Sequence, residues 1–143
     1  MQLILPSRLL RLALVVDAAA TGALAVLQLA MPDSLGRLLM LPRSLLLETG
    51  AFLVGYVLLL VVMARSPRLL SLLVKTVVLG NVLWAVGCAA LLATGAVEPG
   101  AFGMAYVAMQ ALAVLVFACA QYLGMGQSAP AGTRAGKGWQ PGT

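Results

Sequence analysis

Four long apolar segments divide the chain, with short polar breaks between them. They cover residues 9–31, 45–64, 69–94 and 99–123 and are rich in Leu, Ala and Val. Each is long enough to cross a bilayer, which takes about 20 residues of helix. The segments are continuously apolar, whereas barrel strands alternate, and backbone groups in lipid must be paired internally. The pattern predicts an all-α bundle of four transmembrane helices.

The breaks predict where the helices start and stop. Residues 33–41 mix Leu, Met and one Arg behind Asp33, which is typical of a short helix lying at the interface. Gly95 is expected to stop the third span, and Pro99 to open the fourth. The first span is expected to be retained, because it is too long for a signal-peptide core.

The domain organisation follows from these segments. Residues 1–123 are predicted to form one transmembrane domain. Residues 124–143 turn to Gly, Ser, Pro, Ala and Thr and are predicted to be a flexible tail. Trp139 is the tail residue suited to anchoring at the bilayer surface.

Composition narrows the function classes. The chain of 143 residues is 62% hydrophobic and 9% charged, against about 25% charged residues in soluble domains. It contains no histidine, which removes His-ligated haem and most transition-metal sites. No nucleophile–base pair, phosphate loop or metal cluster stands out. We therefore expect no enzymatic activity, no cofactor and no metal. Cys88 and Cys119, the two cysteines, are expected to be small buried apolar residues, with a redox role as the alternative.

The basic residues predict the orientation. The net charge is +5, but the basic residues are spread over the span ends without a stacking groove, so no nucleic-acid partner is expected. Two of them, Arg37 and Arg43, fall on one side of the membrane. Seven fall on the other side: Arg8, Arg11, Arg65, Arg68, Lys75, Arg134 and Lys137. The positive-inside rule then places both termini in the cytoplasm. We expect a multi-pass protein of a bacterial cytoplasmic membrane.

An internal similarity links the second and fourth spans. Residues 48–57 and 98–107 share Glu, Gly, Ala, Phe, Tyr and Val at an offset of fifty. A second offset relates the first and third spans and pairs Arg11 with Lys75 and Asp17 with Asn81. One interpretation is two tandem hairpins related by a pseudo-twofold axis along the membrane normal. The other is coincidence among low-complexity helices.

Asp17 is the most informative polar position inside a span. It lies six residues, about 9 Å, past Arg11 and must face protein, because an acid at a helix centre costs about 2.5–3.5 kcal/mol. Thr21 and Gln28 share its helix face. The group is either a proton or cation site, or a hydrogen-bonded contact between the first span and Asn81 of the third.

The remaining candidate residues form stripes. Asn81 and Trp84 share one face of the third span, and Gln110 and Gln121 lie with Tyr106 and Phe117 on the fourth. Contact between helices or with a partner is the simpler interpretation. The outer-end carboxylates Glu48 and Glu98 are expected to favour the positive ends of helices rather than bind a ligand or metal.

These features resemble small uncharacterised bacterial four-span integral membrane proteins. The residues that carry the likeness are Asp17, the 50–56 stretch, Asn81-x-x-Trp84, and Gln110 with Gln121. The DoxX-like group is similar in its number of spans. Small multidrug transporters are similar too, but they have Glu where this chain has Asp17. The likeness implies a four-helix membrane fold and assigns no residue a role.

The function expected from the sequence is non-catalytic. The leading hypothesis is an accessory or scaffolding subunit that packs against a larger membrane complex or against itself. The alternative is a small proton-coupled transporter using Asp17. A weaker alternative is a membrane redox helper using the cysteines. A polar, water-reachable cavity ending at Asp17 would count against the scaffold, whereas an Asp17 sealed against Asn81, together with an outer face docked on another protein, would count against transport.

Overall fold

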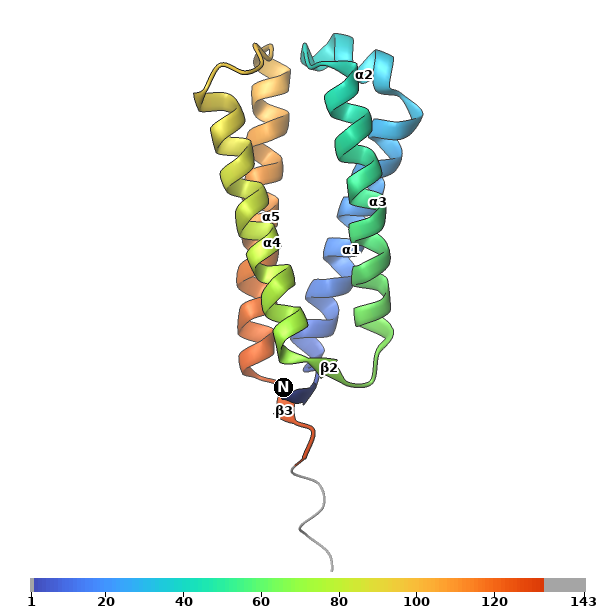
Figure 1. Ribbon diagram of the computed structural model, residues 1–143, viewed down its shortest axis with the longest axis vertical. Helices are drawn as coiled ribbons and strands as arrows, with labels where there is room; N and C mark the ends of the chain where they lie inside the picture. Colours follow the sequence, from blue (N-terminus) through green and yellow to red (C-terminus); the bar gives the residue numbers. More distant parts are fainter. Residues whose placement is uncertain (1, 133–143) are drawn as a thin grey trace, which may run out of the picture.

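A computed structural model of the chain describes residues 2–132. Its elements follow the order β1 (Leu3–Leu5), α1 (Arg8–Ala30), α2 (Pro32–Leu39), α3 (Arg43–Arg65), β2 (Leu69–Leu70), α4 (Ser71–Ala93), α5 (Ala101–Gly126) and β3 (Ala129–Pro130) (Figure 1). The four long helices are apolar and long enough to cross a membrane, as the sequence predicts. Their ends lie within three residues of the predicted bounds.

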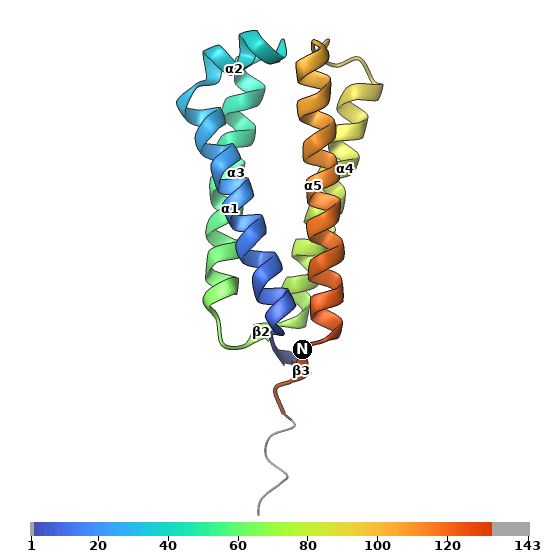
Figure 2. The same ribbon diagram turned by 180° about the vertical axis from the view of Figure 1, so that it is seen from behind.

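The helices form two hairpins that pack against each other on one side more than on the other. α1 packs along α3, and α4 packs along α5. Between the hairpins, α1 packs along α5, whereas α3 and α4 make few contacts (Figures 1 and 2). The hairpins converge at the end that carries the strands and separate toward α2. The bundle is therefore closed on its α1–α5 side and open on its α3–α4 side.

Three very short strands tie the chain together at one end. β1 pairs antiparallel with β2, Leu3 opposite Leu70, and with β3, Ile4 opposite Pro130. These strands cannot be predicted from the sequence, because two or three residues show no periodicity. Because β1 pairs with β3, the first and last described segments lie at the same end of the bundle. This agrees with the prediction that the chain enters and leaves the membrane on the same side.

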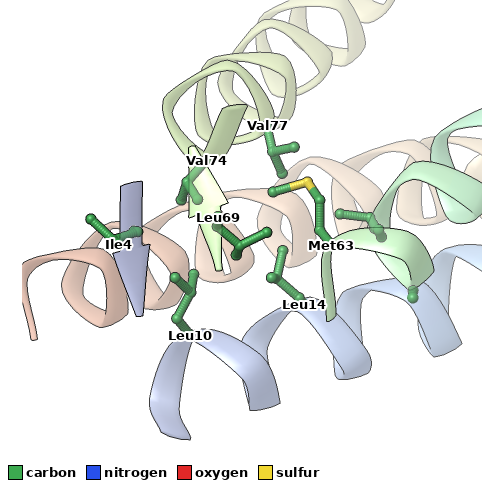
Figure 3. Close-up of a cluster of buried hydrophobic side chains, with 9 residues drawn as sticks. Ile4, Leu10, Leu14, Met63, Leu69, Val74 and Val77 are labelled. Carbon is green, nitrogen blue, oxygen red and sulfur yellow. The ribbon is translucent and has the colours of Figure 1, made fainter. Parts of the chain in front are cut away.

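Two apolar clusters fill the bundle near its ends. At the strand end, residues of α1, α3 and α4 meet Ile4 and Leu69 of the sheet: Leu10, Leu14, Met63, Val74 and Val77 (Figure 3). At the α2 end, a second cluster collects Leu35, Leu39, Leu41, Leu46 and Val107.

α2 is the short helix expected between the first two spans. It starts at Pro32, a favoured first position, and ends at Leu39, followed by Met40 as its C-cap, whose φ of 55° is left-handed. Asp33 therefore lies in the first turn instead of capping it. The Asp33 carboxylate pairs with Arg43 of α3 at 3.0 Å, the one ion pair within residues 2–132.

The start of the fourth span differs from the prediction. α5 begins at Ala101, with Gly100 as its N-cap, so Pro99 lies outside the helix. The Gly100 N–H donates to the Leu39 carbonyl oxygen at 3.2 Å, and the Gly103 backbone lies against that same carbonyl without room for a Cβ. Docking against α2 fixes this boundary. Gly95, with φ of 66°, confirms the predicted stop of the third span.

The end of the fourth span also differs. α5 continues to Gly126, three residues into the segment expected to be flexible, and β3 follows. Gly124 packs on the Leu10 backbone, so this last turn is held by α1. The described residues do not include Arg134 and Lys137, which were expected on the cytoplasmic side, or Trp139, which was expected to anchor at the bilayer surface.

The residues matched at an offset of fifty lie at different depths. Tyr56 bonds to Asn81 in the layer of Asp17, whereas Tyr106 bonds to Gln28. Asp17 and Gln28 are eleven residues apart on α1, which is about 16 Å along the axis. The offset therefore does not relate equivalent positions, and the unequal packing between hairpins gives the predicted pseudo-twofold no support.

Candidate functional site

Asp17 is the centre of a buried polar layer that joins all four spans. Its side chain is 0% exposed. Oδ2 accepts hydrogen bonds from Gln121 Nε2 at 2.7 Å and from Asn81 Nδ2 at 3.1 Å. Oδ1 accepts one from Thr21 Oγ1 at 3.0 Å. Tyr56 OH lies 3.5 Å from Oδ2. We call these five residues the Asp17 network.

The protons within the Asp17 network can be assigned from the distances. Tyr56 OH is nearer to Asn81 Oδ1, at 3.0 Å, than to Asp17 Oδ2, so its single proton goes to Asn81. Asn81 Nδ2 also contacts Gln121 Oε1 at 3.1 Å, which uses its second proton. Amide and hydroxyl donors therefore surround both carboxylate oxygens, and no ion pair to Asp17 occurs within residues 2–132.

A second polar group lies nearer to α2. Gln28, 2% exposed, donates from Nε2 to Tyr106 OH at 2.8 Å. Its Oε1 lies 3.1 Å from Thr49 Oγ1, whose proton can also go to the Leu45 carbonyl oxygen at 2.6 Å. This group joins α1 to α3 and α5. Every buried side-chain nitrogen and oxygen in the described part of the chain has a partner.

The two polar groups hold the helices together through hydrogen bonds inside the bundle. Unsatisfied polar groups in hydrocarbon cost several kcal/mol, so the groups fix which faces of α1, α3, α4 and α5 turn inward. Asp17, Thr21, Gln28, Asn81 and Gln121 are all buried. The predicted stripe on α1 is thus brought into direct contact with α4 and α5.

An intramembrane crevice of about 830 Å³ separates α3 from α4. It is lined by side chains of all four spans, almost entirely apolar, and none of its lining residues is charged. Thr21, Tyr56 and Asn81 form part of its wall, but Asp17 lies behind them and does not line it. The crevice opens to the outer surface of the bundle where α3 and α4 make few contacts.

An aromatic pair bridges this opening. The rings of Phe52 on α3 and Trp84 on α4 stack with centroids 5.8 Å apart and planes 11° apart. Both residues line the crevice. Trp84 therefore belongs to the crevice and not to the Asp17 network, although it shares a helix face with Asn81.

Gln110 is the predicted site residue that finds no partner. Its side chain lines the crevice and is half-buried, and it makes no hydrogen bond to any residue from 2 to 132. It thus differs from Gln121 on the same helix, which is fully buried and bonded to Asp17.

Glu48 and Glu98 lie at the α2 end of the bundle and are exposed. Glu48 is in the second turn of α3, and Glu98 is in the loop before α5, so neither lies in the first turn of its helix. The favourable interaction with a helix end fades beyond that turn. The structure therefore gives no support to the helix-end role expected for them.

The cysteines lie at different depths of the membrane domain. Cys88 lines the crevice two turns from Asn81, whereas Cys119 is exposed on α5 near the Asp17 network. Both thiols are free. The expectation of burial is therefore wrong for Cys119, and the depth difference argues against a dithiol pair. Within the described ranges, no group of three or more Cys, Asp or Glu side chains is placed to hold a metal.

Sequence reasoning missed the roles of Tyr56 and Thr49. Tyr56 links Asp17 to Asn81, and Thr49 meets Gln28. Both could have been found from the sequence, because each is a polar side chain within an apolar span, and such side chains face other helices. Comparison with protein-family models, curated proteins and solved structures finds no match for this chain.

Proposed function

We propose that this chain is a non-catalytic integral membrane protein that serves as an accessory or scaffolding subunit. The observation that carries the proposal is the sealed state of Asp17. Its carboxylate is fully buried, bonded by amide and hydroxyl donors from α1, α4 and α5, and separated from the crevice. The hydrogen bonds of such a network hold the four spans in fixed positions relative to one another.

The same geometry speaks against the transport alternative. A proton-coupled site needs a path by which water reaches the carboxylate and leaves it again. Here Thr21, Tyr56 and Asn81 stand between Asp17 and the crevice, and the crevice itself is apolar. Asp17 acts in this proposal as a structural acceptor.

The decisive experiment isolates the protein from its native membrane at its natural abundance. Mild detergent extraction followed by native electrophoresis should show the chain in a larger assembly, with the same partner at constant stoichiometry in independent preparations. Migration as a free chain in every detergent would contradict the accessory role. If the partner is another copy, the assembly contains this chain alone in a fixed number of copies.

A second measurement addresses transport directly. The purified chain in proteoliposomes with an internal pH dye should show no proton flux above that of empty vesicles after a pH jump. The matched variant Asp17→Asn keeps the shape and removes the titrating group. A flux in the wild type that disappears in this variant would overturn the proposal in favour of a carrier.

A further inference from the structure

The crevice between α3 and α4 contains two polar groups that the protein leaves unused. Gln110 and Trp84 both line it, and neither the Gln110 carboxamide nor the Trp84 indole N–H has a hydrogen-bond partner among residues 2–132. Gln110 is nine residues past the start of α5, about 13 Å along the axis. Trp84 is thirteen residues past the start of α4 and nine before its end. Both groups therefore lie at the depth of the hydrocarbon core, where no water can satisfy them.

We propose that this crevice binds an uncharged, lipid-soluble small molecule that carries at least one acceptor oxygen, such as a carbonyl, on an apolar body. The apolar body would fill the space walled by Phe52, Trp84 and Phe117, and the acceptor oxygen would take the free N–H donors of Gln110 and Trp84. The absence of charged lining residues selects for an uncharged molecule.

The volume of the crevice indicates which kind of molecule can bind in it. A crevice of about 830 Å³ falls in the range of roughly 300–1,000 Å³ typical of small-molecule pockets. A partner's spanning helix, about 30 Å long and 10–12 Å across, occupies on the order of 2,500 Å³ and cannot enter. A plain acyl chain would fill apolar space but leave Gln110 and Trp84 unsatisfied. The head group of a phospholipid lies at the membrane surface, away from Gln110.

Glycines on α4 give a way to close the crevice without disturbing the fold. Gly80 and Gly87 line it, and a Cβ added at either meets no atom within 4 Å. Gly87→Leu therefore places a side chain in open space. Gly55 on α3 is equally open but does not line the crevice, so Gly55→Leu is the matched control.

The test is solvent extraction of the full chain purified in mild detergent, followed by mass spectrometry of the extract. Wild type and Gly55→Leu should retain the same uncharged oxygen-containing compound, close to one per chain. Gly87→Leu should lower its amount at least about tenfold. Helical circular dichroism and gel filtration establish that each variant is folded. Equal amounts in all three proteins, or bulk phospholipid alone, would overturn the proposal.

The native cysteines give a second measurement that needs no variant. Cys88 lines the crevice, whereas Cys119 is exposed outside it. Removing the bound compound by detergent exchange should speed the reaction of Cys88 with N-ethylmaleimide severalfold and leave Cys119 unchanged. An unchanged Cys88 rate would contradict occupancy. Gln110→Leu should also lower the amount of bound compound, because it removes one of the two free donors that would hold the acceptor oxygen.

This inference stands apart from the accessory role. Both tests use the isolated chain, so they give the same answer whether or not the protein assembles with a partner. A protein partner lost from native membranes in Gly87→Leu, with no small molecule in the wild-type extract, would assign the crevice to assembly and overturn the ligand.

Discussion

Gln121 donates from Nε2 to Asp17 Oδ2 at 2.7 Å, joining residues 104 positions apart on the first and last spans. This is the shortest of the contacts around Asp17. It closes the bundle on the α1–α5 side, the side on which the two hairpins pack together. On the opposite side, α3 and α4 are joined by the Tyr56–Asn81 hydrogen bond at 3.0 Å and by the Phe52–Trp84 ring pair, and the crevice lies between them.

Gln121→Leu should lower the free energy of unfolding by about 1–2 kcal/mol. Hydrogen bonds within membrane bundles average about 0.6 kcal/mol, but this one serves a fully buried carboxylate that would be left short of a donor. Thermal unfolding in detergent measures the change. Gln127→Leu is the control, because Gln127 is exposed and its side chain has no hydrogen bond in the described chain. If both variants lowered the free energy of unfolding equally, the Gln121–Asp17 hydrogen bond would not stabilise the bundle.

Gly124→Ala should destabilise the bundle by about 1–3 kcal/mol, because overpacking forces backbones apart. A Cβ at Gly124 would lie 2.6 Å from the Leu10 nitrogen, a backbone atom that cannot step aside. Gly55→Ala should instead stabilise by about 0.5–1 kcal/mol, since its Cβ meets nothing and alanine favours helix. Denaturation of both variants in the same detergent measures the change in the free energy of unfolding. Changes of the same sign would contradict the close packing of Gly124 on the Leu10 backbone.

Ser7→Ala should cost about 1–2 kcal/mol and loosen the strand end of the bundle. Ser7 Oγ caps α1 by accepting from the Leu10 N–H at 3.1 Å and donates to the Gly124 carbonyl oxygen at 2.7 Å. Hydrogen exchange should rise in the first turn of α1 and the last turn of α5 together. Ser44→Ala, at an exposed residue, should leave both unchanged. A rise confined to α1 would mean that the contact with Gly124 adds nothing.

The orientation can be tested with introduced cysteines in a Cys88→Ser, Cys119→Ser background. Ala96→Cys in the α4–α5 loop should react with a membrane-impermeant maleimide on intact cells. Pro67→Cys, beside Arg65 and Arg68, should react only after permeabilisation, because the excess of basic residues favours the cytoplasm. Both positions are exposed, so access within the protein is matched. The reverse result would invert the predicted topology.

The sequence alone determined the four spans and the burial of Asp17. A bilayer permits few backbone arrangements, so length and hydropathy suffice to locate helices, and a carboxylate in hydrocarbon must face protein. The burial of Thr21, Gln28, Asn81 and Gln121 follows the same logic, because polar side chains in a span seek partners.

Only the tertiary structure decided which helices meet and which stay apart. Helices that are apolar on every side carry no pattern telling a packed face from a lipid face, so the α1–α5 contact and the α3–α4 crevice leave no trace in the hydropathy. Gln110 and Gln121 look alike in the sequence. Gln121 is bonded to Asp17 and Gln110 faces the open crevice, because side-chain packing between helices sets the rotation of α5.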